Sequence, residues 1–219
     1  MADLLLYLPG LAIAAVITVA TFIYMWLRTR RFRQVAREVC RSGFSSPDGP
    51  RFHWVRRSEA WEALRSLTGT WGGRRAHIAH WALPRLVGEF NSLFSRVEVE
   101  HRGPPGFRLF THGNGVRRPS RSLGLAELDL PPHRLWTNDP DLARRLVARN
   151  PGLLDEGTVH IQDGTVGILR RWHIHDAKEF VRLLRTAQAL AQGVEQAGGS
   201  QPAAAPARPP WPPPPNTVL

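Results

Sequence analysis

The 219-residue chain has almost no cysteine and almost no lysine. Cys40 is the single cysteine, so no intramolecular disulfide can form, which agrees with a cytoplasmic domain. Lys178 is the single lysine, and the net charge of +11 therefore comes from arginine. A basic balance this strong first suggests nucleic acid. The arginines are scattered in pairs, however, and no helix-turn-helix, zinc-finger or RNA-recognition pattern accompanies them, so a nucleic-acid partner is not expected.

Motifs for catalysis are also missing. The sequence has no GxSxG elbow, no HExxH pair, no P-loop and no dinucleotide-binding glycine pattern. We therefore assign no catalytic residue, no cofactor and no small-molecule substrate, and we expect a protein that is not an enzyme. A membrane-tethered nucleic-acid-binding protein remains one alternative.

Histidines provide a second alternative. His173 and His175 are two residues apart and would share one face of a strand, where both could reach one metal ion. His77, His80 or His160 could supply a third ligand. Single histidines on a solvated sheet face are the commoner explanation, so the metal assignment is none. A membrane-tethered metal-dependent enzyme that uses this cluster stays open.

Charge is absent altogether between Leu4 and Leu27. The part from Pro9 to Leu27 would form a helix of about 28 Å, close to the hydrocarbon thickness of a bilayer. Tyr7 at one end, and Tyr24 and Trp26 at the other, suit the two aromatic belts of a membrane. No basic residue precedes the apolar run, and no small-residue cleavage site follows it, which disfavours a signal peptide. We predict a single transmembrane helix over residues 4–27.

Arginines follow this helix directly. The chain outside the span carries Asp3 on one side and Arg28, Arg30, Arg31, Arg33 and Arg37 on the other. Basic residues stay in the cytoplasm, so the N-terminus is expected outside and the main domain inside a bacterial inner membrane. These arginines would also meet anionic lipid headgroups.

The remainder of the chain predicts an α+β domain. Residues 1–3 form a short end, residues 28–51 a basic juxtamembrane segment and linker, and residues 52–196 the domain. Within it we expect a mainly antiparallel sheet of four to six strands with two or three helices. The predicted helices cover 58–67, 138–152 and 176–196. The predicted strands include 69–81, 94–101, a partner strand at 107–112, and a hairpin that turns at Gln162-Asp163-Gly164. Residues 113–134 are expected to form a loop.

The last segment, residues 197–219, is rich in alanine and proline and predicts an extended tail. One tryptophan among prolines makes a good docking peptide, so Arg208, Trp211, Pro212 and Pro213 are candidate partner-binding residues.

One inert span, an Arg/Trp-rich domain and an extended tail together predict a non-catalytic accessory or scaffold subunit. Its partners would be the subunits of a multi-span membrane protein complex, with a photosynthetic or respiratory assembly as the class suggested by this layout.

Overall fold

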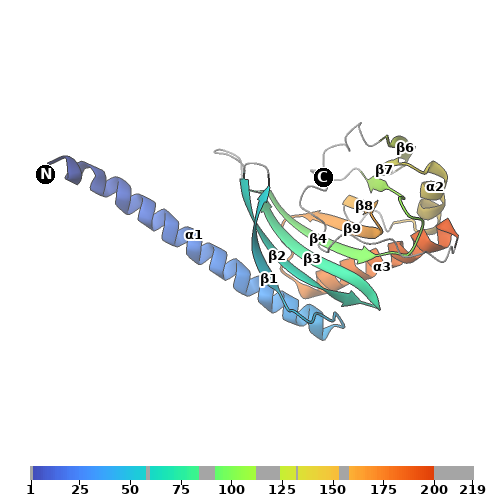
Figure 1. Ribbon diagram of the computed structural model, residues 1–219, viewed down its shortest axis with the longest axis horizontal. Coiled ribbons are helices and arrows are strands. Elements are labelled where there is room, and N and C mark those ends of the chain that lie inside the picture. Colours follow the sequence, from blue (N-terminus) through green and yellow to red (C-terminus); the bar gives the residue numbers. More distant parts are fainter. Residues whose placement is uncertain are drawn as a thin grey trace.

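The computed structural model describes residues 2–57, 60–83, 92–111, 124–131, 133–152 and 158–199. A long N-terminal helix, α1, leads into a curved antiparallel sheet with two further helices (Figure 1). This arrangement agrees with the predicted α+β class. The candidate residues of the tail, Arg208, Trp211, Pro212 and Pro213, lie outside the described residues, as does the Tyr7 side chain.

Helix α1 is a single continuous element from Ala2 to Arg41. Its part from Gly10 onward contains an 18-residue window with a mean hydropathy of 2.1, and none of that window is buried. By length and composition this helix can cross a membrane. The final turns differ, because Phe32, Val35, Ala36 and Val39 are buried in the core. Their spacing places them on one stripe of the helix. The first part of α1 is therefore exposed outside the domain, while its last turns belong to the core of the domain.

The described strands form one nine-stranded sheet in the order β1-β2-β3-β4-β9-β8-β5-β7-β6, with every pair antiparallel. This exceeds the four to six strands predicted. The bounds are β1 Arg51–Arg57, β2 Ala60–Trp71, β3 Arg74–Leu83, β4 Ser92–Glu100, β5 Leu109–Thr111, β6 Ala126–Leu130, β7 His133–Thr137, β8 Thr158–Gln162 and β9 Thr165–Arg171.

The helix predicted over residues 58–67 is wrong, because β2 occupies most of this range. Its composition of Ala, Glu, Leu and Arg favours a helix locally, but β2 lies between β1 and β3 and pairs with both. Tertiary pairing therefore overrides the local preference. The strand predicted over 69–81 is confirmed for residues 74–81, which belong to β3. Residues 69–71 end β2, and Gly72 and Gly73, with φ angles of +55° and +75°, form the tight turn between the two strands.

Two further predictions need correction. The segment 107–112 does contain a strand, β5, but it pairs with β7 and β8 and not with the strand at 94–101. That strand, β4, already has β3 on one side and β9 on the other. Within the loop predicted over 113–134, the described residues form β6 and the start of β7.

Helix α2, Pro140–Arg149, and helix α3, Ala177–Gly198, are both confirmed. Asp139 caps α2 by accepting a hydrogen bond from the Leu142 amide, and Asp176 caps α3 through the Lys178 amide. The hairpin of β8 and β9 is also confirmed, with Asp163 and Gly164 at positive φ.

The apolar stripe of α3 is buried throughout, at Phe180, Leu183, Leu184, Ala187, Leu190, Ala191 and Val194. It packs on one face of the sheet against β4 and β9. Side chains on the other face of these two strands point away from α3.

Candidate membrane interface

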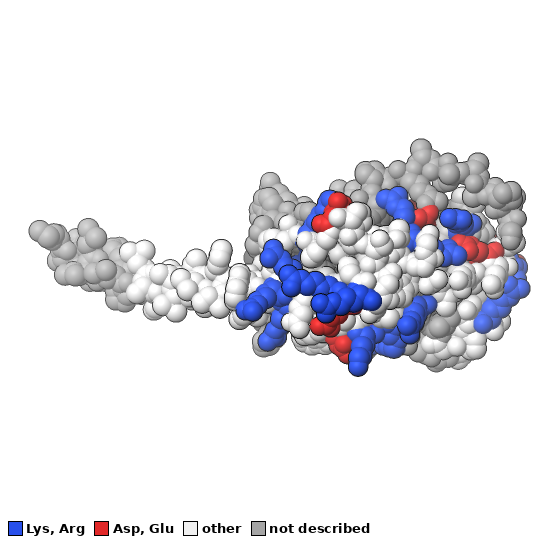
Figure 2. Space-filling model, turned by 90° about the horizontal axis from the view of Figure 1, so that it is seen from below, with Lys and Arg blue, Asp and Glu red and all other residues white. Residues whose placement is uncertain are grey.

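The junction between the bare helix and the domain is lined with arginine. Residues 28–41 of α1 carry six arginines and one glutamate, and we call this segment the basic collar. Figure 2 shows basic side chains gathered where the uncharged rod of α1 meets the body of the molecule. The Arg28 guanidinium lies 4.4 Å from the centre of the Tyr24 ring, and that of Arg30 lies 5.5 Å from the Trp26 ring. Four of the residues predicted for a membrane interface thus form two cation–π pairs, each across one helical turn.

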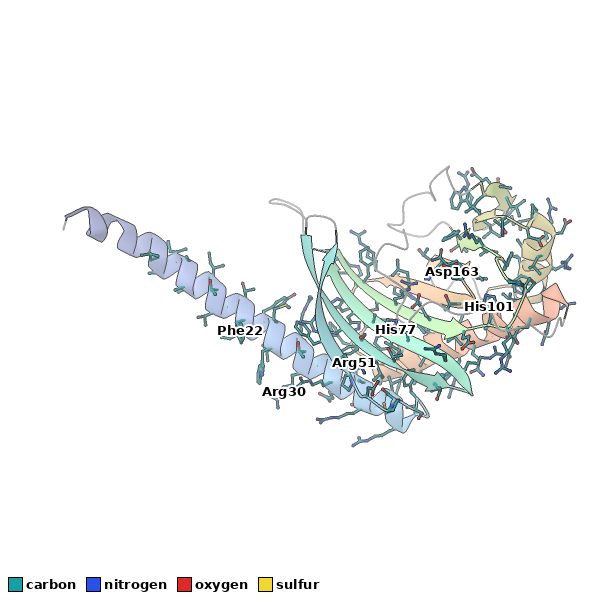
Figure 3. All side chains as sticks on the ribbon, in the orientation of Figure 1. Phe22, Arg30, Arg51, His77, His101 and Asp163 are labelled. Carbon is teal, nitrogen blue, oxygen red and sulfur yellow. The ribbon has the colours of Figure 1, made fainter. Side chains whose placement is uncertain are left out.

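A groove of about 890 Å³ runs along this junction. Figure 3 shows two of its residues: Phe22 on the bare part of α1, and Arg30 where the helix comes beside the sheet. The described residues that line it are Ile17, Thr18, Thr21, Phe22, Met25, Trp26, Thr29, Arg30, Arg33, Gln34, Arg37 and Phe52. All but Phe52, the second residue of β1, belong to α1. The sequence predicted the arginines and the apolar run, but not that they form one continuous groove.

Arg65 of β2 contributes a buried positive charge against the wall of this groove. Its side chain reaches α1, where Nε donates to Thr29 Oγ1 at 3.2 Å and Nη2 donates to the Met25 carbonyl at 3.4 Å. Its guanidinium also lies 5.4 Å from the centre of the Phe52 ring. Burial lowers the pKa of Arg65 to about 10, and the nearby positive charge of Arg28 adds to this effect. Arg65 Nη1 has no hydrogen-bond partner among the described residues.

Three histidines support α1 from the domain side. His80 of β3 stacks on His173, with ring centres 4.5 Å apart and planes 9° apart, and its ring also lies against Phe32 and Phe180. His175 meets the His80 ring edge-on at 6.4 Å. Burial lowers the pKa of His80 well below its usual value, with further lowering from His173 and His175. The structure therefore brings together three of the five histidines considered as metal ligands.

The other two lie elsewhere: His77 is on the opposite face of β3, because residues three apart on a strand point to opposite sides, and His160 lies beside Arg96. Within the part of the chain that the structure describes, no three His, Cys, Asp or Glu side chains are grouped so as to hold a metal ion. The rings of His80, His173 and His175 contact one another by stacking and edge-on packing.

His77 belongs instead to a buried charged row that the sequence analysis missed. Its Nδ1 lies 3.2 Å from Glu98 Oε2, while Arg96 forms an ion pair with Glu98 and donates to His160 Nε2 at 2.8 Å. Gly167 makes room for the His160 ring, because a Cβ there would lie 2.1 Å from His160 Cε1. Burial, with the positive charge of Arg96, lowers the pKa of His77 to about 3. The polar residues that alternate with valine in β4 were the signal that could have revealed this row.

Another ion pair connects β3 to α3 near His101, which Figure 3 labels. Arg74 of β3 binds Glu195 of α3 through two contacts of 2.6 and 2.8 Å, and Glu195 also accepts from the Arg102 amide. The nearby His101 is buried, and its Nδ1 accepts a hydrogen bond from the Gly103 amide at 3.1 Å.

No protein-family model and no curated protein sequence matches this chain. Among solved structures, the crystal structure of the mycobacterial trehalose monomycolate transport factor A, TtfA, is similar in fold. The TM-score is 0.54 at 11% identity, over 80% of this chain and 98% of that chain. The likeness concerns the fold alone.

Proposed function

We propose that this chain is a single-pass, membrane-anchored accessory subunit without catalytic function, which holds its domain at the membrane surface and stabilises a larger assembly of multi-span membrane proteins. The observation that carries the proposal is the continuity of α1. One helix has an apolar part of membrane length with no buried residue and a second part buried in the core of the domain.

The domain is therefore coupled stiffly to its anchor. Phe32, Val35 and Val39 fix α1 to the domain by burial, each at a gain of roughly 1.5–3 kcal/mol. Directly after the helix, Ser45 and Thr70 of β2 exchange two backbone hydrogen bonds of 2.9 and 2.8 Å. A partner that touches both the span and the domain would meet one rigid surface, which suits a scaffold.

The polarity of the anchor follows from its charge. Arginines of the collar would remain on the cytoplasmic side, which leaves the N-terminus outside and the sheet domain in the cytoplasm. Arg28 and Arg30 form cation–π contacts with Tyr24 and Trp26, which supports placing these four side chains together at the cytoplasmic surface of the bilayer.

The buried ionisable groups support an architectural role as well. One buried row on the sheet links four charged or ionisable side chains, those of His77, Arg96, Glu98 and His160. A separate ion pair between Arg74 and Glu195 connects the sheet to α3. These contacts connect β3, β4, β8 and α3. The name of the similar structure, a transport factor, favours a transport assembly over a photosynthetic or respiratory one as the class of partner.

Co-purification from native membranes tests the proposal. The tagged chain is expected to elute from mild detergent in a large assembly of fixed composition. A Gly-Ser insertion between Arg30 and Arg31 separates the span from the last turns of α1, which are buried in the domain. This insertion should reduce the yield of that assembly. The same insertion between Gly198 and Gly199, after α3, is the matched control and should leave it unchanged. A lone 24.6 kDa chain in its micelle would overturn the proposal.

The tail can be tested in the same way. Deleting residues 198–219 is expected to loosen the assembly without removing the chain from the membrane. An assembly of unchanged stability would contradict a docking role for Arg208, Trp211, Pro212 and Pro213.

A further inference from the structure

The groove beside α1 changes its chemistry once along its length. From Ile17 to Trp26 its lining is apolar or hydroxyl-bearing, and this part rises about 14 Å along the helix. Half of a hydrocarbon core of about 30 Å has nearly the same thickness. The first part of the groove thus matches the depth of one leaflet.

The second part of the groove is cationic. Arg30, Arg33 and Arg37 line it, and their spacing of three and four residues places them on one face of α1. The described lining residues include no carboxylate. Arg65 adds its buried guanidinium against Met25, Thr29 and Phe52, three residues of the groove wall, and has one nitrogen unpartnered among the described residues.

We propose that this groove binds one anionic phospholipid of the surrounding bilayer. An acyl chain lies along the wall from Ile17 to Trp26, and the phosphate lies among Arg30, Arg33 and Arg37. The inference rests on the membrane placement of α1 proposed above, and not on the partner assembly.

The order of the two parts selects this occupant over a helix of a partner protein. A phospholipid has acyl chains of one-leaflet length that lead through an ester-linked glycerol to a negatively charged phosphate, which is the order found in the groove. A partner helix at the same position would need carboxylates at the depth of the arginine side chains. The volume of about 890 Å³ also lies within the range of small-molecule sites, roughly 300–1,000 Å³.

Native mass spectrometry of the full chain in detergent tests the charge requirement. Phosphatidylglycerol and phosphatidylcholine with identical acyl chains are titrated separately. We expect one phosphatidylglycerol to bind at least tenfold more tightly than phosphatidylcholine. Arg33→Gln or Arg37→Gln should each weaken phosphatidylglycerol several-fold. Arg41→Gln, an exposed arginine of the same helix outside the groove, is the matched control and should change little.

A second pair of variants tests the apolar part without altering charge. Thr21→Trp fills the groove and should weaken phosphatidylglycerol several-fold. Ile23→Trp, at an exposed position of the same helix that does not line the groove, should not.

Three results would overturn the site. Equal binding of the two lipids would remove the charge requirement, and equal losses in Arg37→Gln and Arg41→Gln would show diffuse attraction to the collar only. A photo-crosslinking residue at Thr21 that captures protein and no lipid in native membranes would assign the groove to a partner helix.

Alkaline extraction of the membranes distinguishes failure of the lipid site from failure of the anchored-subunit proposal. A chain that is extracted contradicts the anchored subunit itself, whereas a resistant chain with no lipid preference contradicts only the lipid site.

Discussion

Replacing Phe32 by alanine tests whether the last turns of α1 are part of the domain core. The Phe32 side chain is 3% exposed, and its ring centre lies 4.9 Å from that of His80. Truncation of a buried phenylalanine to alanine costs about 3–5 kcal/mol. We expect about 3 kcal/mol here, because Phe32 lies at the boundary between the helix and the domain, where neighbours can move into part of the space.

Urea unfolding in detergent micelles measures this loss. The buried Trp71 and Trp136 make intrinsic fluorescence a probe of the core. With a slope of roughly 2–3 kcal/mol per molar urea, the unfolding midpoint should fall by about 1–1.5 M. Phe22→Ala is the matched control, since Phe22 lies ten residues earlier on the same helix and is 76% exposed. Its midpoint should stay unchanged. A fall of less than about 1 kcal/mol for Phe32→Ala, or equal falls for both variants, would refute the docking of α1.

Three further predictions concern the domain. Burial lowers the pKa of His101 to about 4, so the free energy of unfolding should fall as the pH drops from 6.5 towards 4, by about 2 kcal/mol at pH 5. His101→Asn keeps an acceptor for the Gly103 amide and should flatten this part of the pH profile; an unchanged profile would contradict the assignment. Gly167→Ala should cost about 1–3 kcal/mol by thermal or urea unfolding, because the new Cβ overlaps the His160 ring, and little in a His160→Ala background. Glu195→Gln should cost about 1.5–3 kcal/mol at pH 7 through loss of the charged hydrogen bonds. The Arg74 guanidinium lowers the pKa of Glu195 below its usual 4.5, so the difference from the unaltered protein should shrink in acid as that carboxylate becomes protonated.

Local patterns in the sequence were sufficient for the elements that depend on neighbouring residues. The uncharged run from Leu4 to Leu27 indicated a span-length helix, and the patterns over residues 138–152 and 176–196 indicated α2 and α3. Asp163-Gly164 indicated the β8–β9 hairpin, because a tight turn needs residues that tolerate positive φ. In each case the period, the cap or the turn lies within a few residues of what it specifies.

Only the tertiary structure decided which strands pair and which side chains meet. The segment beginning at Ala60 has the composition of a helix and becomes β2, because two neighbouring strands satisfy its backbone. Arg65 had no distinguishing feature in the sequence, yet the sheet brings it to α1 across 36 residues to contact Thr29. The buried row of His77 and Glu98, and the groove that Phe52 completes, arise in the same way. Contacts between residues far apart in the chain depend on register and packing, which leave no local periodicity in the sequence.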